Sequence, residues 1–84
     1  MQRFEDDDTG YLAWVHDHPD GFVVNTEPPP SPGYLMLHRA TCTFITRSSQ
    51  QGRWTAAYLK VCSPELAELH RWAKTMVGGR PSRL

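Results

Sequence analysis

The sequence has little cysteine and no long hydrophobic run. Its cysteines are Cys42 and Cys62, and two are too few to form a disulfide framework. Their spacing to each other and to His38 matches no zinc pattern, so we predict reduced, buried thiols, with a zinc site as the less favoured alternative. No apolar stretch approaches the roughly 18 residues of a membrane span. The acidic N-terminus lacks the apolar core of a signal peptide, which favours a cytoplasmic location without membrane contacts.

Motifs that are typical of enzymes are also missing. The sequence contains no G-x-S-x-G, no H-E-x-x-H and no glycine-rich phosphate loop. A small cluster of His16, Asp17, His18 and Asp20 is interpreted as a solvated helix end, because no further ligand or base stands at a recognised spacing. We therefore predict no enzyme activity, no catalytic residue, no metal and no cofactor.

The chain has no excess of either charge, with nine basic and nine acidic residues, but the charges are unevenly placed. Residues 1–27 carry one base and seven acids, a net −6, whereas residues 28–84 carry eight bases and two acids, a net +6. Such polarity favours binding of an anionic polymer by one face. The alternative is that the two halves neutralise each other in the fold.

Two helices are predicted from the spacing of apolar residues. The first runs from about Thr9 to His16, where Asp8 or Thr9 is a suitable N-cap. The second runs from about Pro64 to Val77, with Ser63 as its N-cap, and residues 78–79 (Gly-Gly) end it. Its apolar stripe consists of Leu66, Leu69, Trp72, Ala73, Met76 and Val77.

Four strands are predicted between these helices, because the intervening segments are rich in β-branched and aromatic residues. They cover Phe22–Thr26, Tyr34–His38, Thr41–Thr46 and Trp54–Cys62, and the proline-rich residues 28–33 form a stiff loop. The predicted class is α+β: a small antiparallel sheet with an N-terminal short helix and a C-terminal helix, packed on one face. Residues 1–8 are expected to form an acidic N-terminal tail, residues 9–79 a single domain, and residues 80–84 a C-terminal tail.

Basic and aromatic residues are interleaved on the predicted sheet and its hairpin tip. Arginine and lysine bind phosphates and base edges, and aromatic rings stack on bases. The alternative is that most aromatic residues fill the core and the bases are plain surface charge. The predicted DNA-binding residues are His38, Arg39, Arg47, Ser49, Gln50, Arg53 and Lys60.

Several segments together resemble a family of small bacterial modules, mostly actinobacterial, that occur alone or beside nuclease-like domains. The resemblance covers residues 10 to about 77. Its most specific pieces are Leu37-His38-Arg39-Ala40-x-Cys42 and Tyr58-x-Lys60-Val61-Cys62. Further matching pieces are Tyr11-Leu12-Ala13-Trp14, His18 to Asn25, Trp54-Thr55 and Glu68-Leu69-x-x-Trp72-Ala73.

This resemblance implies a module that reads 5-methylcytosine in double-stranded DNA, with a hydrophobic cage around the methyl group. A methyl group is read by apolar contact and offers less than about 1 kcal/mol of burial, so aromatic packing must supply much of the discrimination. We select Tyr34, Trp54 and Tyr58 as the cage candidates. A homodimer and a nuclease partner are further expected associations. The alternatives are a protein-interaction adaptor that uses exposed aromatic residues and the proline loop and, more distantly, a nuclease that uses His38.

Overall fold

The computed structural model describes residues 1–41, 55 and 58–83. Within them a five-stranded sheet has the order β1-β4-β2-β3-β5. Its first four members pair antiparallel, and β5 pairs parallel with β3. The predicted α+β class is therefore confirmed. The strands are β1 (Gln2–Phe4), β2 (Phe22–Ser31), β3 (Tyr34–Arg39), β4 (Leu59–Ser63) and β5 (Ser82–Arg83), and the helices are α1 (Asp8–Asp17), α2 (Leu66–Trp72) and the π-helical turn η3 (Ala73–Val77).

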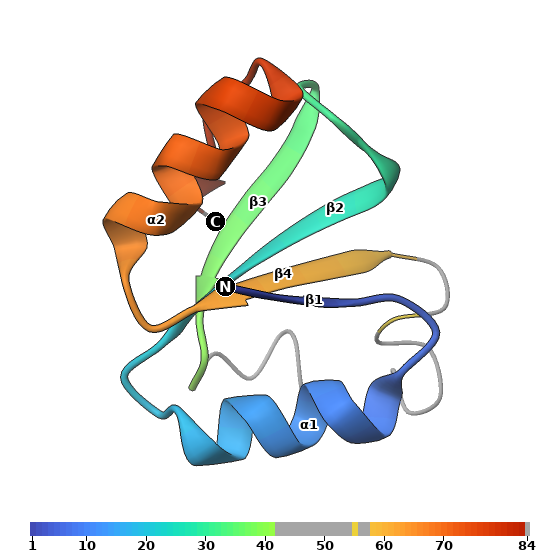
Figure 1. Cartoon of the computed structure of the whole chain (residues 1–84), viewed down its shortest axis with the longest axis vertical. Helices are drawn as coiled ribbons and strands as arrows, with labels where there is room; N and C mark the ends of the chain where they lie inside the picture. Colours follow the sequence, from blue (N-terminus) through green and yellow to red (C-terminus); the bar gives the residue numbers. More distant parts are fainter. Residues whose placement is uncertain (42–54, 56–57, 84) are drawn as a thin grey trace.

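Each α-helix covers its own face of the sheet (Figure 1). Val23 packs in the cluster with α1, whereas its neighbour Val24 packs in the cluster with α2, because successive side chains of a strand point to opposite faces. The C-terminal helix does pack on one face, but the expectation that both helices share that face is wrong. The uninterrupted apolar pair in β2 is typical of a strand that is buried on both sides.

The helix α1 begins one residue earlier than the proposed caps allow. The carboxylate of Asp7 accepts a hydrogen bond from the amide of Gly10 at 2.9 Å and so acts as the N-cap. Asp8 instead tethers a distant residue, since its Oδ1 accepts from the amide and the hydroxyl of Thr55 at 2.7 and 2.6 Å. These contacts hold Thr55, four residues before β4, against the start of α1.

The C-terminal helix starts later than predicted but ends where predicted. Ser63 Oγ accepts from the amide of Glu65 at 3.0 Å and donates to Glu68 Oε1 at 2.6 Å. Gly78 adopts a left-handed φ of 82°, which favours glycine, and its amide donates to the carbonyl of Ala73. This five-residue step is a π turn, which shifts the phase of the helix. Met76 is 75% exposed as a result, so its predicted place in the packed stripe is wrong.

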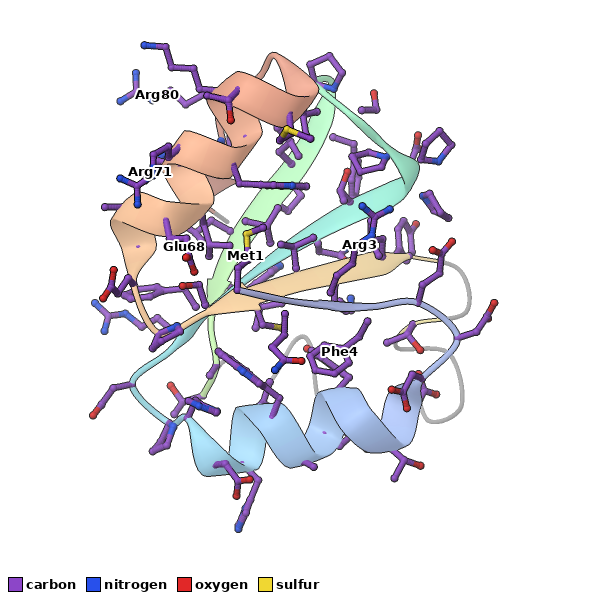
Figure 2. All side chains as sticks on the ribbon, viewed as in Figure 1. Met1, Arg3, Phe4, Glu68, Arg71 and Arg80 are labelled. Carbon is purple, nitrogen blue, oxygen red and sulfur yellow. The ribbon has the colours of Figure 1, made fainter. Side chains whose placement is uncertain are left out.

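Both expected tails belong to the sheet. β1 pairs with β4 and brings Phe4 into the core beside Tyr11, with ring centroids 6.1 Å apart. The N-terminal ammonium lies 3.1 Å from the carboxylate of Glu68 (Figure 2). At the other end, β5 extends the sheet along β3. The predictions of a tail over residues 1–8 and another over residues 80–84 are therefore corrected.

The predicted strands over residues 22–26 and 34–38 are confirmed. β2 continues through the prolines to Ser31, where its pairing register with β3 shifts between Thr26 and Ser31. The strand predicted over residues 41–46 lies outside the described residues except for Thr41. Only the end of the predicted strand over residues 54–62 is seen as β4. No helix of the described part is long and apolar enough to cross a membrane.

Candidate functional site around Lys60

Polar and aromatic side chains share the α1 face of the sheet at the end where β2, β3 and β4 run side by side. Asn25 of β2 is the register partner of Lys60 in β4. In β3 the register partner of Asn25 is Met36. Tyr34 stands two residues before Met36, and Tyr58 stands two residues before Lys60. Because side chains alternate along a strand, Asn25, Lys60, Tyr34 and Tyr58 lie on one face. We call Asn25, Tyr34, Tyr58 and Lys60 the polar cluster.

Lys60 is buried, with 3% of its surface exposed. Its ammonium donates a hydrogen bond to Asn25 Oδ1 and lies 5.8 Å from the ring centroids of both Tyr11 and Tyr58. Among the described residues, no carboxylate lies within ion-pair distance of it. Burial lowers the pKa of Lys60 to about 8, even though the neighbouring Cys62 and Asp8 act to raise it. The site therefore contains a costly buried cation that is held mainly by an amide and two aromatic rings.

Tyr34 and Tyr58 form a stacked pair. Their ring centroids lie 5.6 Å apart and their planes differ by 16°, a geometry typical of attractive aromatic contacts. Tyr58 is 38% exposed and Tyr34 is half-buried, so the pair reaches the surface. Burial and the neighbouring Tyr58 raise the pKa of Tyr34, whereas Asn25 acts to lower it. The pair presents an aromatic surface beside the buried Lys60 ammonium.

Two further titratable groups lie next along the same face and are buried. His38 is 6% exposed, and burial followed by the charge of Lys60 lowers its pKa. Burial raises the pKa of the Cys62 thiol to about 12, against the opposing effect of Lys60. Both groups are therefore neutral near pH 7, and the prediction of a buried, free thiol is confirmed for Cys62. Cys42 lies outside the described residues.

The sequence-predicted contact residues are only partly brought together. Lys60 and His38 are buried rather than on the surface, which corrects their expected role as direct surface contacts to DNA. Arg39 is exposed but belongs to the opposite face, where its guanidinium lies 6.0 Å from the ring centroid of Phe22. Of the cage candidates, Tyr34 and Tyr58 are in contact. The predicted residues that lie outside the described part are Arg47, Ser49, Gln50, Arg53 and Trp54.

Two residues of this site were not anticipated, namely Asn25 and Tyr11. Asn25 stands at the end of an apolar run in a predicted strand, where an amide needs a partner once it is buried. That position was a signal for a buried polar contact. Tyr11 was assigned to the apolar face of the first helix, and nothing in its spacing indicated that its ring would contact a cation from β4.

The charge asymmetry of the sequence is also spatial. Among the described residues, the exposed acids Asp7, Asp17 and Asp20 lie in or beside α1. Exposed Arg71 and Lys74 lie on α2 and η3, and Figure 2 shows Arg71 and Arg80 pointing outward on the α2 side. Glu65 and Glu68 also lie on the α2 side, and Glu68 pairs with the N-terminal ammonium, so the two signs of charge are only partly separated between the faces.

The histidine and aspartate cluster at the end of α1 has a structural role. The ring of His18 stacks on Trp14 with centroids 4.3 Å apart, and its Nδ1 lies 2.9 Å from the Trp14 carbonyl oxygen. His16, Asp17 and Asp20 are exposed. In the described part of the chain, no three histidine, cysteine or acidic side chains gather as metal ligands would. The interpretation as a helix end is confirmed.

Comparisons with known protein families, with curated proteins and with solved structures find no match to this chain. Inference about function therefore depends on the polar cluster and its surroundings.

Proposed function

We infer that this domain binds double-stranded DNA and reads 5-methylcytosine through the aromatic surface of Tyr34 and Tyr58. The observation that supports this proposal is the stacked contact between these two residues, which come from different strands, with Tyr58 reaching the surface. An exposed aromatic surface held from behind by a second ring is a suitable platform for a base or a methyl group.

The aromatic surface of Tyr34 and Tyr58 suits a nucleobase better than a phosphate group. Stacking of one base on an aromatic side chain contributes about 1–3 kcal/mol and tolerates any base. The methyl group of 5-methylcytosine adds apolar contact to this stacking, as the thymine methyl does. Exposed Arg39, Arg71 and Lys74 lie on the opposite face of the sheet, so they contribute long-range attraction of the phosphate backbone rather than contacts beside the tyrosine pair.

The test is a comparison of two duplexes of the same sequence, one with and one without 5-methylcytosine. Fluorescence anisotropy should give tighter binding of the methylated duplex at every salt concentration, and both affinities should fall steeply as salt rises. Equal affinities for the two duplexes would refute methyl reading, and the absence of binding at low salt would refute DNA binding.

A protein-interaction adaptor is the second candidate, and one observation favours it. Pro28 and Pro29 are exposed in the segment that leads to the β2–β3 turn. Exposed proline rings offer apolar surface to a protein partner. This candidate predicts that a Pro28→Ala, Pro29→Ala variant binds DNA like the wild type but loses its protein partner in pull-down experiments.

A further inference from the structure

The strand β1 forms one edge of the sheet. It pairs with β4 on one side, and in the described part of the chain no strand pairs with its other side. Gln2, Arg3 and Glu5 are exposed, and neither proline nor glycine stands in this segment. The outward-facing N–H and C=O groups of such an edge strand can pair with a strand of another chain. The β1 edge is therefore open to strand addition.

The two faces of β1 differ in character. Phe4 is 8% exposed and belongs to the core cluster with α1. Arg3 is the register partner of Val61, which packs in the cluster with α2, and Figure 2 shows Arg3 and Phe4 on opposite sides of the ribbon. Glu5 follows directly after the strand, before the backbone turns at Asp6, where φ is 52°. Because side chains alternate, Arg3 and Glu5 share the α2 face.

The charges of Arg3 and Glu5 are not compensated within the domain. Neither side chain forms an ion pair with another described residue. The edge therefore presents one positive and one negative charge, two residues apart and on the same face. An antiparallel second copy reverses this order, so the segment is complementary to itself.

The charges also select the register of such a pair. In an antiparallel pair of identical strands, opposed residues share a face, so the twofold axis passes through one residue. An axis at Arg3 would oppose two arginines, and an axis at Glu5 would oppose two glutamates. An axis at Phe4 places Arg3 opposite the partner's Glu5 twice and brings the two Phe4 rings together. Opposite charges and aromatic pairs stabilise such a contact, whereas like charges destabilise it.

We propose that β1 is a homodimer interface, in which a second copy of this chain pairs antiparallel around Phe4 and joins the two sheets into one. The partner is thus identified by the self-complementary charges of the edge. The contact is short, so the dimer is weak and depends on protein concentration.

The dimer has a consequence for recognition. A twofold axis through paired strands runs perpendicular to the sheet, so it leaves both α1 faces on the same side. Both copies of the Tyr34–Tyr58 pair then face one way, and a single duplex can engage the two together. This consequence rests on the proposed function, whereas the dimer itself does not.

Sedimentation velocity of the full chain from about 10 μM to about 1 mM tests the interface. The wild type should shift from monomer toward dimer over this range. Arg3→Glu and Glu5→Arg should each weaken association about tenfold, because two attractive cross-strand pairs become repulsive. Lys74→Glu makes the same charge change on η3 and should leave association unchanged. A wild type that stays monomeric at about 1 mM would overturn the proposal.

Mixing the two single variants is the decisive experiment. In a mixed pair each residue again faces the opposite charge, so an equal mixture of Arg3→Glu and Glu5→Arg should associate about as strongly as the wild type. The double variant Arg3→Glu, Glu5→Arg should do the same. A mixture that associates no better than its components would overturn the proposal.

Circular dichroism and thermal unfolding should show that both single variants fold, since Arg3 and Glu5 are exposed. If one of them does not fold, the double variant decides: dimerisation like that of the wild type supports the interface, and a monomer overturns it. A wild type that dimerises but binds no duplex would refute only the proposed function.

Discussion

Asn25 and Lys60 face each other across β2 and β4, and the amide oxygen of one accepts from the buried ammonium of the other. Strand register alone creates this pair, which stands on the α1 face beside the rings of Tyr11 and Tyr58. An amide is a weak substitute for a carboxylate as the partner of a buried cation. Maintaining a charged lysine here therefore reduces stability.

Lys60→Met should remove this cost to stability. The pKa of Lys60 is lowered from 10.5 to about 8 in the folded state, so the unfolded chain binds more protons between these values. The unfolding free energy of the wild type should therefore rise with pH, by about 1 kcal/mol between pH 7 and pH 9. Urea unfolding at both pH values measures it. Lys60→Met should lack this rise, whereas Lys74→Met should retain it.

Cys62 should be an unreactive thiol in the folded protein. It is fully buried and burial raises its pKa to about 12, so almost no thiolate exists at pH 8. In a Cys42→Ser background, a thiol reagent such as Ellman's should react with Cys62 only after denaturant is added. Rapid reaction of the native protein would show that β4 opens readily.

The N-cap of α1 requires the carboxylate of Asp7 and the lack of a side chain at Gly10. A Cβ atom added at Gly10 would lie 2.4 Å from the Asp7 carboxylate oxygen, so the cap must move to admit a side chain. Asp7→Ala should cost about 1 kcal/mol of stability by loss of the cap, and Gly10→Ala should be destabilising despite the better helix propensity of alanine. Thr9→Ala, at an exposed position of the same turn, should be nearly neutral in thermal unfolding.

The sequence predicted the fold well where a pattern had enough length. Gly78 ends the C-terminal helix, and strands begin at Phe22 and at Tyr34. These boundaries follow from local chemistry that the structure confirms. β1 and β5 have three and two residues, too few to show alternation, and both form because an existing strand offers an unpaired edge. The exposure of Met76 results from a π turn, which ordinary helical spacing cannot anticipate.

The residue types of the candidate site could be predicted from the sequence, but the burial of its residues could not. Tyr34 and Tyr58 were selected as aromatic residues on a sheet, and their contact is a consequence of register across β2. Lys60 was assigned to the surface because lysine is almost never buried. Its position two residues after Tyr58 and two before Cys62, in a strand that is buried throughout, was the signal against that assignment.

The two sides of the C-terminal helix should respond differently to substitution. Leu69 is fully buried against the sheet, whereas Met76 is exposed. Leu69→Ala should cost about 2–5 kcal/mol by leaving a cavity, and Met76→Ala should change stability by less than about 0.5 kcal/mol. Chemical unfolding of both variants measures the contrast. A large loss in the methionine variant would mean that the helical phase beyond Trp72 differs from that of the π turn.

Tyr58→Ala is the substitution that best separates recognition from folding. Tyr58 is partly exposed and forms only one layer of the stacked pair, so its removal should lower the melting temperature by a few degrees at most, in line with about 1 kcal/mol. It should, however, abolish most of the preference for the methylated duplex, because the ring supplies the stacking surface. Weak, salt-sensitive binding should persist through the exposed basic residues. Met76→Ala is the control for loss of an exposed apolar side chain elsewhere. If Tyr58→Ala folds normally and still distinguishes the two duplexes as the wild type does, the Tyr34–Tyr58 pair is not the reading surface.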